Sequence, residues 1–196
     1  MPKMPSFLTG KIGRAAVLGA ALLVAACANP GAGLPPLPEQ TSNAYLLGTG
    51  DQLRITVFND PRLTGEFRVT DAGRVALPLV GAIPAAGRTT SQLERAIEGA
   101  LRERRLFNEP SVAVEVNQYR PIFVLGMVER GGETPFQPGM NVLSAVAVVG
   151  GFNYRAVTDR VSITRRGPDG VAREYLGERS SQLQPGDVVT VFERRF

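Results

Sequence analysis

The sequence has no histidine and no tryptophan, and Cys27 is its one cysteine. Its two lysines, Lys3 and Lys11, lie near the amino terminus. Metal sites normally recruit histidine or cysteine, and nucleophilic catalysis normally recruits a histidine or lysine base. Most hydrolase and transferase mechanisms are therefore excluded. We expect no catalytic residue, no metal site and no cofactor.

Charge is concentrated at the start of the chain. The whole sequence has 22 basic and 18 acidic residues and a pI of about 9.7. Residues 1–26 contain Lys3, Lys11 and Arg14 but no acidic residue. The rest of the chain is nearly neutral, so the basic pI gives no support for nucleic-acid binding.

Residues 1–26 are typical of a secretory signal peptide, because basic residues precede a short apolar run that ends in small residues. A membrane-spanning helix would need about 20 apolar residues. The segment Val24-Ala25-Ala26-Cys27 resembles the bacterial lipobox, in which the cysteine is lipidated and becomes the first residue after cleavage. We predict lipid attachment at Cys27. The alternative is a secreted protein that is cleaved nearby and keeps a free thiol.

The segment after the cysteine predicts the location of the protein. In such lipoproteins an aspartate next to the cysteine favours retention in the inner membrane, and here the residue is Ala28. We therefore expect a lipid-anchored protein of the outer membrane that faces the periplasm. Residues 27–44 are rich in proline and glycine, which predicts a partly extended linker between the bilayer and the folded part.

Residues 45–121 predict a first α+β unit. Gln52 to Phe58 alternates apolar and polar residues and indicates a strand. Residues 67–69 and 75–79 continue the alternation on either side of a turn at residues 71–73, which predicts a hairpin. Ser91 and Glu94 indicate the capping box of an amphipathic helix that ends before Pro110, and a last strand follows.

Residues 122–196 predict a second unit. The order is a strand, a glycine turn, a short strand, a helix capped by Asn141 and ended by Gly150 and Gly151, a hairpin and a final strand from Val188 to Phe192. This is the element order of a β-grasp domain. The whole chain is thus expected to be α+β, with a sandwich-like first domain followed by a β-grasp domain.

Two similar turns precede strands in the two units. Gly50-Asp51 precedes the strand that ends at Val57-Phe58, and Gly186-Asp187 precedes the one that ends at Val191-Phe192. We interpret both as structural turns, in which glycine supplies a positive φ and aspartate accepts from turn amides. A saccharide or calcium contact is the alternative. A phosphate loop at residues 48–53 is disfavoured, because the third glycine is absent and a strand follows.

The segments YLLGTGDQLRITV (residues 45–57) and GRVALPLVG (residues 73–81) resemble the opening of the bacterial polysaccharide export domain. Members of that family commonly show a Gly-Asp turn before the first strand and then a glycine-led strand that reaches a Pro-Leu-Val/Ile-Gly segment. Gly73, Pro78 and Gly81 hold these positions here. Residues 122–196 resemble the soluble-ligand-binding β-grasp domain that follows in the family. The order of the motifs is more specific than any one of them.

The resemblance implies an outer-membrane polysaccharide export lipoprotein. Such proteins form homo-oligomeric rings around a channel for capsular or exopolysaccharide and work with a polysaccharide co-polymerase in the inner membrane. Larger relatives carry a second β-grasp domain and a C-terminal helix that crosses the outer membrane. We expect this chain to belong to the short subclass, with a possible separate partner in the outer membrane.

Two other functions are considered. A β-grasp lipoprotein could bind a saccharide or regulate an envelope complex without conducting polymer. An envelope glycosidase would need two carboxylates about 5 to 10 Å apart, and the sequence selects no such pair. Tyr119 and Arg120 are interpreted as hinge packing rather than sugar stacking, and Arg102, Arg104 and Arg105 as a solvated helix end rather than a contact with an anionic polymer.

Overall fold

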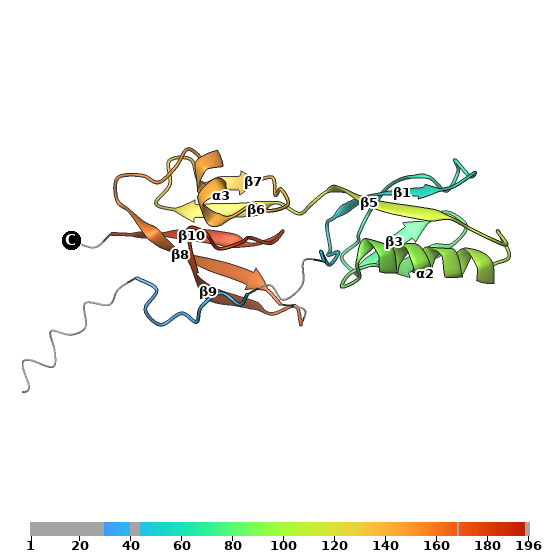
Figure 1. Cartoon of the computed structure of the whole chain (residues 1–196), viewed down its shortest axis with the longest axis horizontal. Helices are drawn as coiled ribbons and strands as arrows, with labels where there is room; N and C mark the ends of the chain where they lie inside the picture. Colours follow the sequence, from blue (N-terminus) through green and yellow to red (C-terminus); the bar gives the residue numbers. More distant parts are fainter. Residues whose placement is uncertain (1–29, 40–43, 168, 195–196) are drawn as a thin grey trace, which may run out of the picture. The chain divides into compact units, whose positions relative to one another are not determined.

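The computed structural model describes residues 30–39, 44–167 and 169–194 (Figure 1). The described residues fall into two units, residues 30–33 and the residues from Leu34 onward. Residues 30–33 of the first unit form a turn, and Cys27 lies outside the described residues. In the described part of the chain, no helix has the length and apolarity needed to cross a membrane. Residues 34–196 contain two hydrophobic clusters, and the fold is of the α+β class, as expected.

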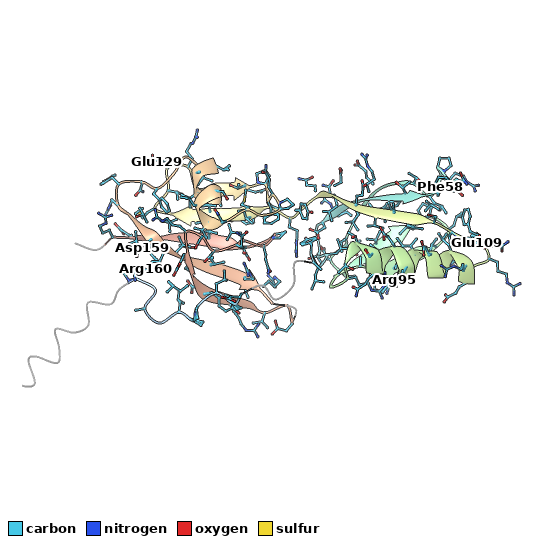
Figure 2. All side chains as sticks on the ribbon, in the orientation of Figure 1. Phe58, Arg95, Glu109, Glu129, Asp159 and Arg160 are labelled. Carbon is cyan, nitrogen blue, oxygen red and sulfur yellow. The ribbon has the colours of Figure 1, made fainter. Side chains whose placement is uncertain are left out.

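The first cluster lies beneath an antiparallel sheet with the strand order β2-β1-β5. Its strands are β1 (Gln52–Val57), β2 (Gly65–Arg68) and β5 (Val112–Gln118). The predicted first strand is confirmed, because its alternate residues Leu53, Ile55 and Val57 are buried. The strand ends one residue before the prediction. Phe58 follows it as an exposed side chain (Figure 2).

The predicted hairpin between residues 67–69 and 75–79 is wrong. β2 pairs with β1, whereas β3 (Arg74–Leu77) pairs with β4 (Gly81–Pro84) in a separate two-stranded sheet. Between β2 and β3 the chain turns a corner in which the Thr70 N–H donates to the Arg74 carbonyl oxygen. Leu79 does not continue the buried face: it is exposed, with φ of 62°, at the tip of the β3–β4 turn.

Helix α2 (Thr90–Glu103) buries Leu93, Ile97 and Leu101 in the first cluster. Its capping box is formed by Thr89 and Gln92, two residues before the predicted pair. Glu94 does not cap the helix, because its carboxylate accepts from the Val114 N–H at 2.9 Å.

The helix therefore also completes the sheet edge at β5. Glu94 accepts from Val114, and Glu98, one helical turn later, accepts from the Val112 N–H at 3.3 Å. These N–H groups alternate along β5, the edge strand of the sheet. Two carboxylates on one helix face thus supply the acceptors that a further strand would otherwise provide.

The second cluster is covered by a five-stranded mixed sheet with the order β7-β6-β10-β8-β9. The central strand of the sheet is β10 (Val188–Glu193), and β6 (Ile122–Gly126) runs parallel to it. The other elements are β7 (Gly132–Thr134), α3 (Val142–Val148), β8 (Ala156–Arg166) and β9 (Ala172–Glu178). The predicted element order is confirmed, and so is Asn141 as the N-cap of α3. Gly150 and Gly151, both with φ of 95°, end that helix.

Part of the predicted linker belongs to this sheet. The Leu37 N–H donates to the Leu176 carbonyl oxygen, and the Leu176 N–H donates to the Pro35 carbonyl oxygen. Pro36 thereby forms a parallel bridge with the outer side of β9, and Leu37 packs against the second cluster. Residues 35–37 therefore pair with the sheet edge instead of forming a free spacer.

Two glycines allow a matched test of this architecture. Gly99 lies within α2, and a Cβ there would meet no atom within 4 Å. We expect Gly99→Ala to raise the free energy of unfolding by about 1 kcal/mol, because alanine has the higher helix propensity. Urea denaturation followed by circular dichroism measures the change.

The control is Gly126→Ala at the end of β6. Gly126 has φ of 85°, and a Cβ there would lie 2.3 Å from the Val191 carbonyl oxygen of β10. This variant should be clearly less stable than the wild type. Equal stability of the two variants would contradict the close approach of β6 and β10.

Candidate functional site

Asp51 is fully buried at the start of β1 and accepts several hydrogen bonds. Its carboxylate accepts from the Tyr45 hydroxyl at 2.6 Å, the Gly48 N–H at 2.7 Å and the Arg120 N–H at 3.2 Å. The Arg120 Nε atom lies 3.3 Å from the same carboxylate. A buried charge needs such partners, since an unpaired carboxylate would be strongly destabilising.

Asp187, at the start of β10, has an equivalent environment. It is 1% exposed and forms a two-point ion pair with Arg165, with distances of 3.0 Å to Nε and 2.7 Å to Nη2. Its carboxylate also accepts from the Gln184 N–H at 2.8 Å. Each aspartate thus accepts from the amide three residues before it and binds an arginine from a distant segment.

The backbone of the two turns is also equivalent. The Asp51 N–H donates to the Gly48 carbonyl oxygen, and the Asp187 N–H donates to that of Gln184. Gly50 and Gly186 have φ of 96° and 88°, which favour glycine. Because donors of the protein occupy both carboxylates, turn stabilisation accounts for the two motifs without a saccharide or a cation.

Three aromatic rings pack beside the Asp51 network. The Tyr119 ring makes edge-to-face contacts with Tyr45, at a centroid distance of 5.0 Å, and with Phe136, at 5.5 Å. Arg120 also donates to the Tyr45 hydroxyl at 3.2 Å. Tyr119 and Arg120 therefore pack the segment between β5 and β6 against its surroundings.

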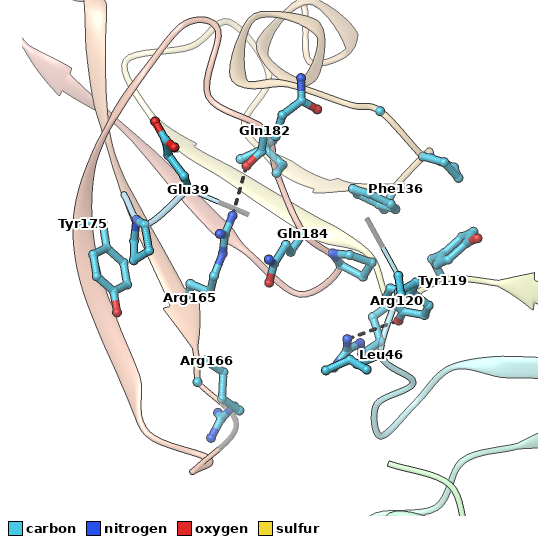
Figure 3. A pocket seen from close by; sticks show the side chains of 18 residues that line it. Glu39, Leu46, Tyr119, Arg120, Phe136, Arg165, Arg166, Tyr175, Gln182 and Gln184 are labelled. Atoms are coloured by element: carbon cyan, nitrogen blue, oxygen red, sulfur yellow. Dashed lines mark hydrogen bonds between the residues drawn. The ribbon is translucent and has the colours of Figure 1, made fainter. Parts of the chain in front are cut away.

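The same segment borders a pocket of about 700 Å³ (Figure 3). Tyr175 lies on one side and Tyr119 with Phe136 on the other, while Gln184 projects between them. The residues of interest in its lining are Tyr119, Phe136, Arg165, Tyr175, Gln182 and Gln184. Sequence reasoning selected only Tyr119 of these, and Arg120, which also lines the pocket.

The other predicted motif residues lie away from this pocket. Gly73, Pro78 and Gly81 belong to the turns around β3, and Gly150 and Gly151 follow α3. Of the pocket residues that the sequence analysis did not select, Gln184 could have been found, because it belongs to the same turn as Asp187. No local pattern indicates Phe136 or Tyr175, which reach the pocket from separate elements.

The arginines at the end of α2 contact the protein itself. Arg102 pairs with Glu98 at 3.4 Å, and Arg104 donates to the Leu79 carbonyl oxygen at 3.1 Å. Arg105 takes the left-handed conformation after the helix, with φ of 56°. These contacts agree with the interpretation of a helix end and give no support for a polymer contact there.

The two buried aspartates should differ in how much they stabilise the fold. Asp51→Ala leaves Arg120, which is 29% exposed and can be partly hydrated, whereas Asp187→Ala leaves Arg165 at 11% exposure. We expect both losses to fall within roughly 3 to 5 kcal/mol, with the larger loss for Asp187→Ala. Denaturant unfolding measures both. Asp71→Ala, at an exposed turn, is the control, and losses no larger than its loss would contradict a stabilising role of the two buried ion pairs.

The Asp51 network also predicts a pH dependence. Burial, and then the hydrogen bond to Asp51, raise the pKa of Tyr45 far above its ordinary value of 10.0. A raised pKa stabilises the fold fully below the unfolded value, and this stabilisation is lost as the pH rises above about 10. The free energy of unfolding should therefore fall more steeply between about pH 10 and 12 in the wild type than in Tyr45→Phe. Parallel pH profiles would exclude the effect.

Comparison with known proteins finds a family match for the first part of this chain and relatives for most of it. Residues 39–117 match the family described as polysaccharide biosynthesis/export protein. The exopolysaccharide production protein ExoF of Rhizobium meliloti is 33% identical over 174 residues, which cover 82% of this chain and 40% of ExoF. The capsule polysaccharide export outer membrane protein CtrA of Neisseria meningitidis is 36% identical over 134 residues, which cover 64% of this chain and 34% of CtrA.

A third relative is also named for polysaccharide export. The EPS I polysaccharide export outer membrane protein EpsA of Ralstonia solanacearum is 27% identical over 183 residues, which cover 76% of this chain and 48% of EpsA. This chain thus spans less than half the length of each of these relatives. Residues 39–117 therefore match the polysaccharide biosynthesis/export family, and most of this chain is similar to proteins named for exopolysaccharide production or polysaccharide export.

Proposed function

We propose that this chain is a lipid-anchored subunit of an outer-membrane channel that exports capsular polysaccharide or exopolysaccharide. The observation that carries the proposal is the export domain at residues 39–117, followed by a mixed sheet with a parallel central pair of strands. Relatives that share most of this chain are named for exopolysaccharide production or polysaccharide export. In this proposal residues 45–121 and 122–196 act as an export domain and a β-grasp domain.

The proposed role requires assembly and conduction, with no chemical step. The two most buried carboxylates, Asp51 and Asp187, are each paired with an arginine. Hydrogen-bond donors of the protein therefore occupy both carboxylates. The proposed partners are other copies of this chain in a ring, an inner-membrane polysaccharide co-polymerase, the polymer, and a separate outer-membrane partner.

The pairing of residues 35–37 with β9 leaves only a short segment between Cys27 and the sheet. If Cys27 carries the lipid, an extended chain from Cys27 to Leu34 spans at most about 25 Å. The linker would thus hold the edge of the five-stranded sheet close to the bilayer. Two or more acyl chains are sufficient for stable anchoring, whereas a single chain gives marginal binding.

A second candidate is a saccharide-binding lipoprotein that conducts nothing. The pocket beside Tyr119 and Tyr175 favours it, because a binding protein needs a defined site. The two functions differ in assembly. Electron microscopy of the detergent-extracted protein should give a ring for a channel subunit and a monomer for a binding module.

The decisive experiment is a deletion strain complemented with the wild type or with Cys27→Ser. The deletion should abolish surface polymer and leave synthesis of the repeat unit intact. The wild-type protein should be found in the membrane fraction and should restore surface polymer. The variant should be soluble and should fail to restore it, because its fold is unchanged but its anchor is absent.

The outcomes separate function from anchoring. Normal surface polymer in the deletion strain would overturn the export function. Cys27→Ser that stays in the membrane fraction would overturn the lipid anchor as the membrane attachment and leave the export function standing. Immunoblots of both fractions verify that the two proteins are present in equal amounts.

A further inference from the structure

Helix α3 carries no charged residue on any side, although one of its sides is exposed. Its inner side packs on the five-stranded sheet through three buried residues (Figure 1). Its outer side, the α3 patch, consists of four exposed residues: Leu143, Ser144, Ala147 and Val148. A surface helix normally presents charged residues to solvent, and a helix that is apolar all round is typically buried. The α3 patch is therefore expected to be covered by a partner.

The α3 patch continues into a hollow of about 360 Å³. Ser144 and Val148 line the hollow together with residues that precede the helix, among them Pro135, Pro138 and Met140. No charged residue belongs to this lining. The hollow can thus accept an apolar side chain that projects from a partner.

The opposite face of the same sheet is a second uncharged surface. Strand residues alternate between the two faces, and Ile122 and Val124 of β6 are buried in the second cluster. Phe123 and Leu125 therefore lie on the other face, where they are 38% and 44% exposed. Their partners on β10 are uncharged as well. These four residues form the sheet patch: Phe123, Leu125, Val188 and Thr190.

We propose that the α3 patch of one copy of this chain binds the sheet patch of the next copy. This proposal rests on the channel function proposed above, and it adds the two faces that meet and the head-to-tail direction of the contact. A contact between two different patches is heterologous, and it generates a ring when the rotation between copies closes. Each sheet then lies between its own α3 and that of a neighbour, a layer order that is common within single domains.

Charges at the borders of the patches favour contact between unlike patches. Arg179 borders the α3 patch, because its carbonyl oxygen accepts from the Leu143 N–H. Glu133 borders the sheet patch as the cross-strand partner of Phe123. Both charged residues are exposed. Two α3 patches, or two sheet patches, would bring like charges together, whereas the mixed contact brings opposite charges together.

The test measures the assembly of the detergent-extracted full chain by analytical ultracentrifugation. Leu143→Glu places a charge on the α3 patch, and Leu125→Glu places one on the sheet patch. Each variant alone should raise the concentration at which copies associate by at least about tenfold. A mixture of the two should form dimers that grow no further, because the intact sheet patch of one variant still binds the intact α3 patch of the other.

The matched control is Val171→Glu, at a residue that is 51% exposed and belongs to neither patch. It should assemble like the wild type, and thermal unfolding verifies that all three variants are folded. Dimers of Leu125→Glu alone would indicate a two-fold contact between α3 patches and overturn the head-to-tail direction.

Two further results separate the interface from the channel function. Wild-type assembly by both patch variants, or a mixture that stays monomeric, would overturn this interface and leave the ring and the export function standing. A wild type that is monomeric at every concentration would overturn the ring itself, and with it this interface. Surface polymer in the deletion strain tests the export function independently of either result.

Discussion

The structure depends on two buried aspartates, each of which pairs with an arginine from a distant part of the sequence. Asp51 joins the turn before β1 to Arg120, which follows β5, and so links the start of β1 to the end of its antiparallel neighbour. Asp187 joins the turn before β10 to Arg165 at the end of β8. A desolvated carboxylate without a cation would cost several kcal/mol, so each turn is stable only when its arginine is in place. The local turn and the long-range packing are therefore coupled.

One edge of the three-stranded sheet and one edge of the five-stranded sheet are completed by groups that come from outside the sheets. Carboxylates of Glu94 and Glu98 accept from alternate N–H groups of β5, and residues 35–37 pair with Leu176 of β9. Unpaired strand edges invite association with other chains. In this protein a helix and the segment after the predicted anchor occupy them. The predicted linker thus has a structural role in addition to its role as a tether.

Regular patterns predicted much of the fold, and their failures have physical reasons. Alternation identified β1 and the order of elements after residue 122, and Asn141 marked the start of α3. The hairpin of residues 67–79 was wrong because alternation gives the buried face of a strand but not its partner. The capping box was misplaced because Glu94, a good capping residue, bonds to β5 instead.

The sequence by itself determined the local structure, the Gly-Asp turns and the kinship with export proteins, since each depends on residues close together in the chain. Tertiary structure decided which arginine meets each aspartate and which side chains form the pocket. Asp51 and Arg120 are 69 residues apart, and Phe136 and Tyr175 come from different elements of the second unit. Such contacts follow from how strands pair and cores pack, and short-range periodicity carries no information about them.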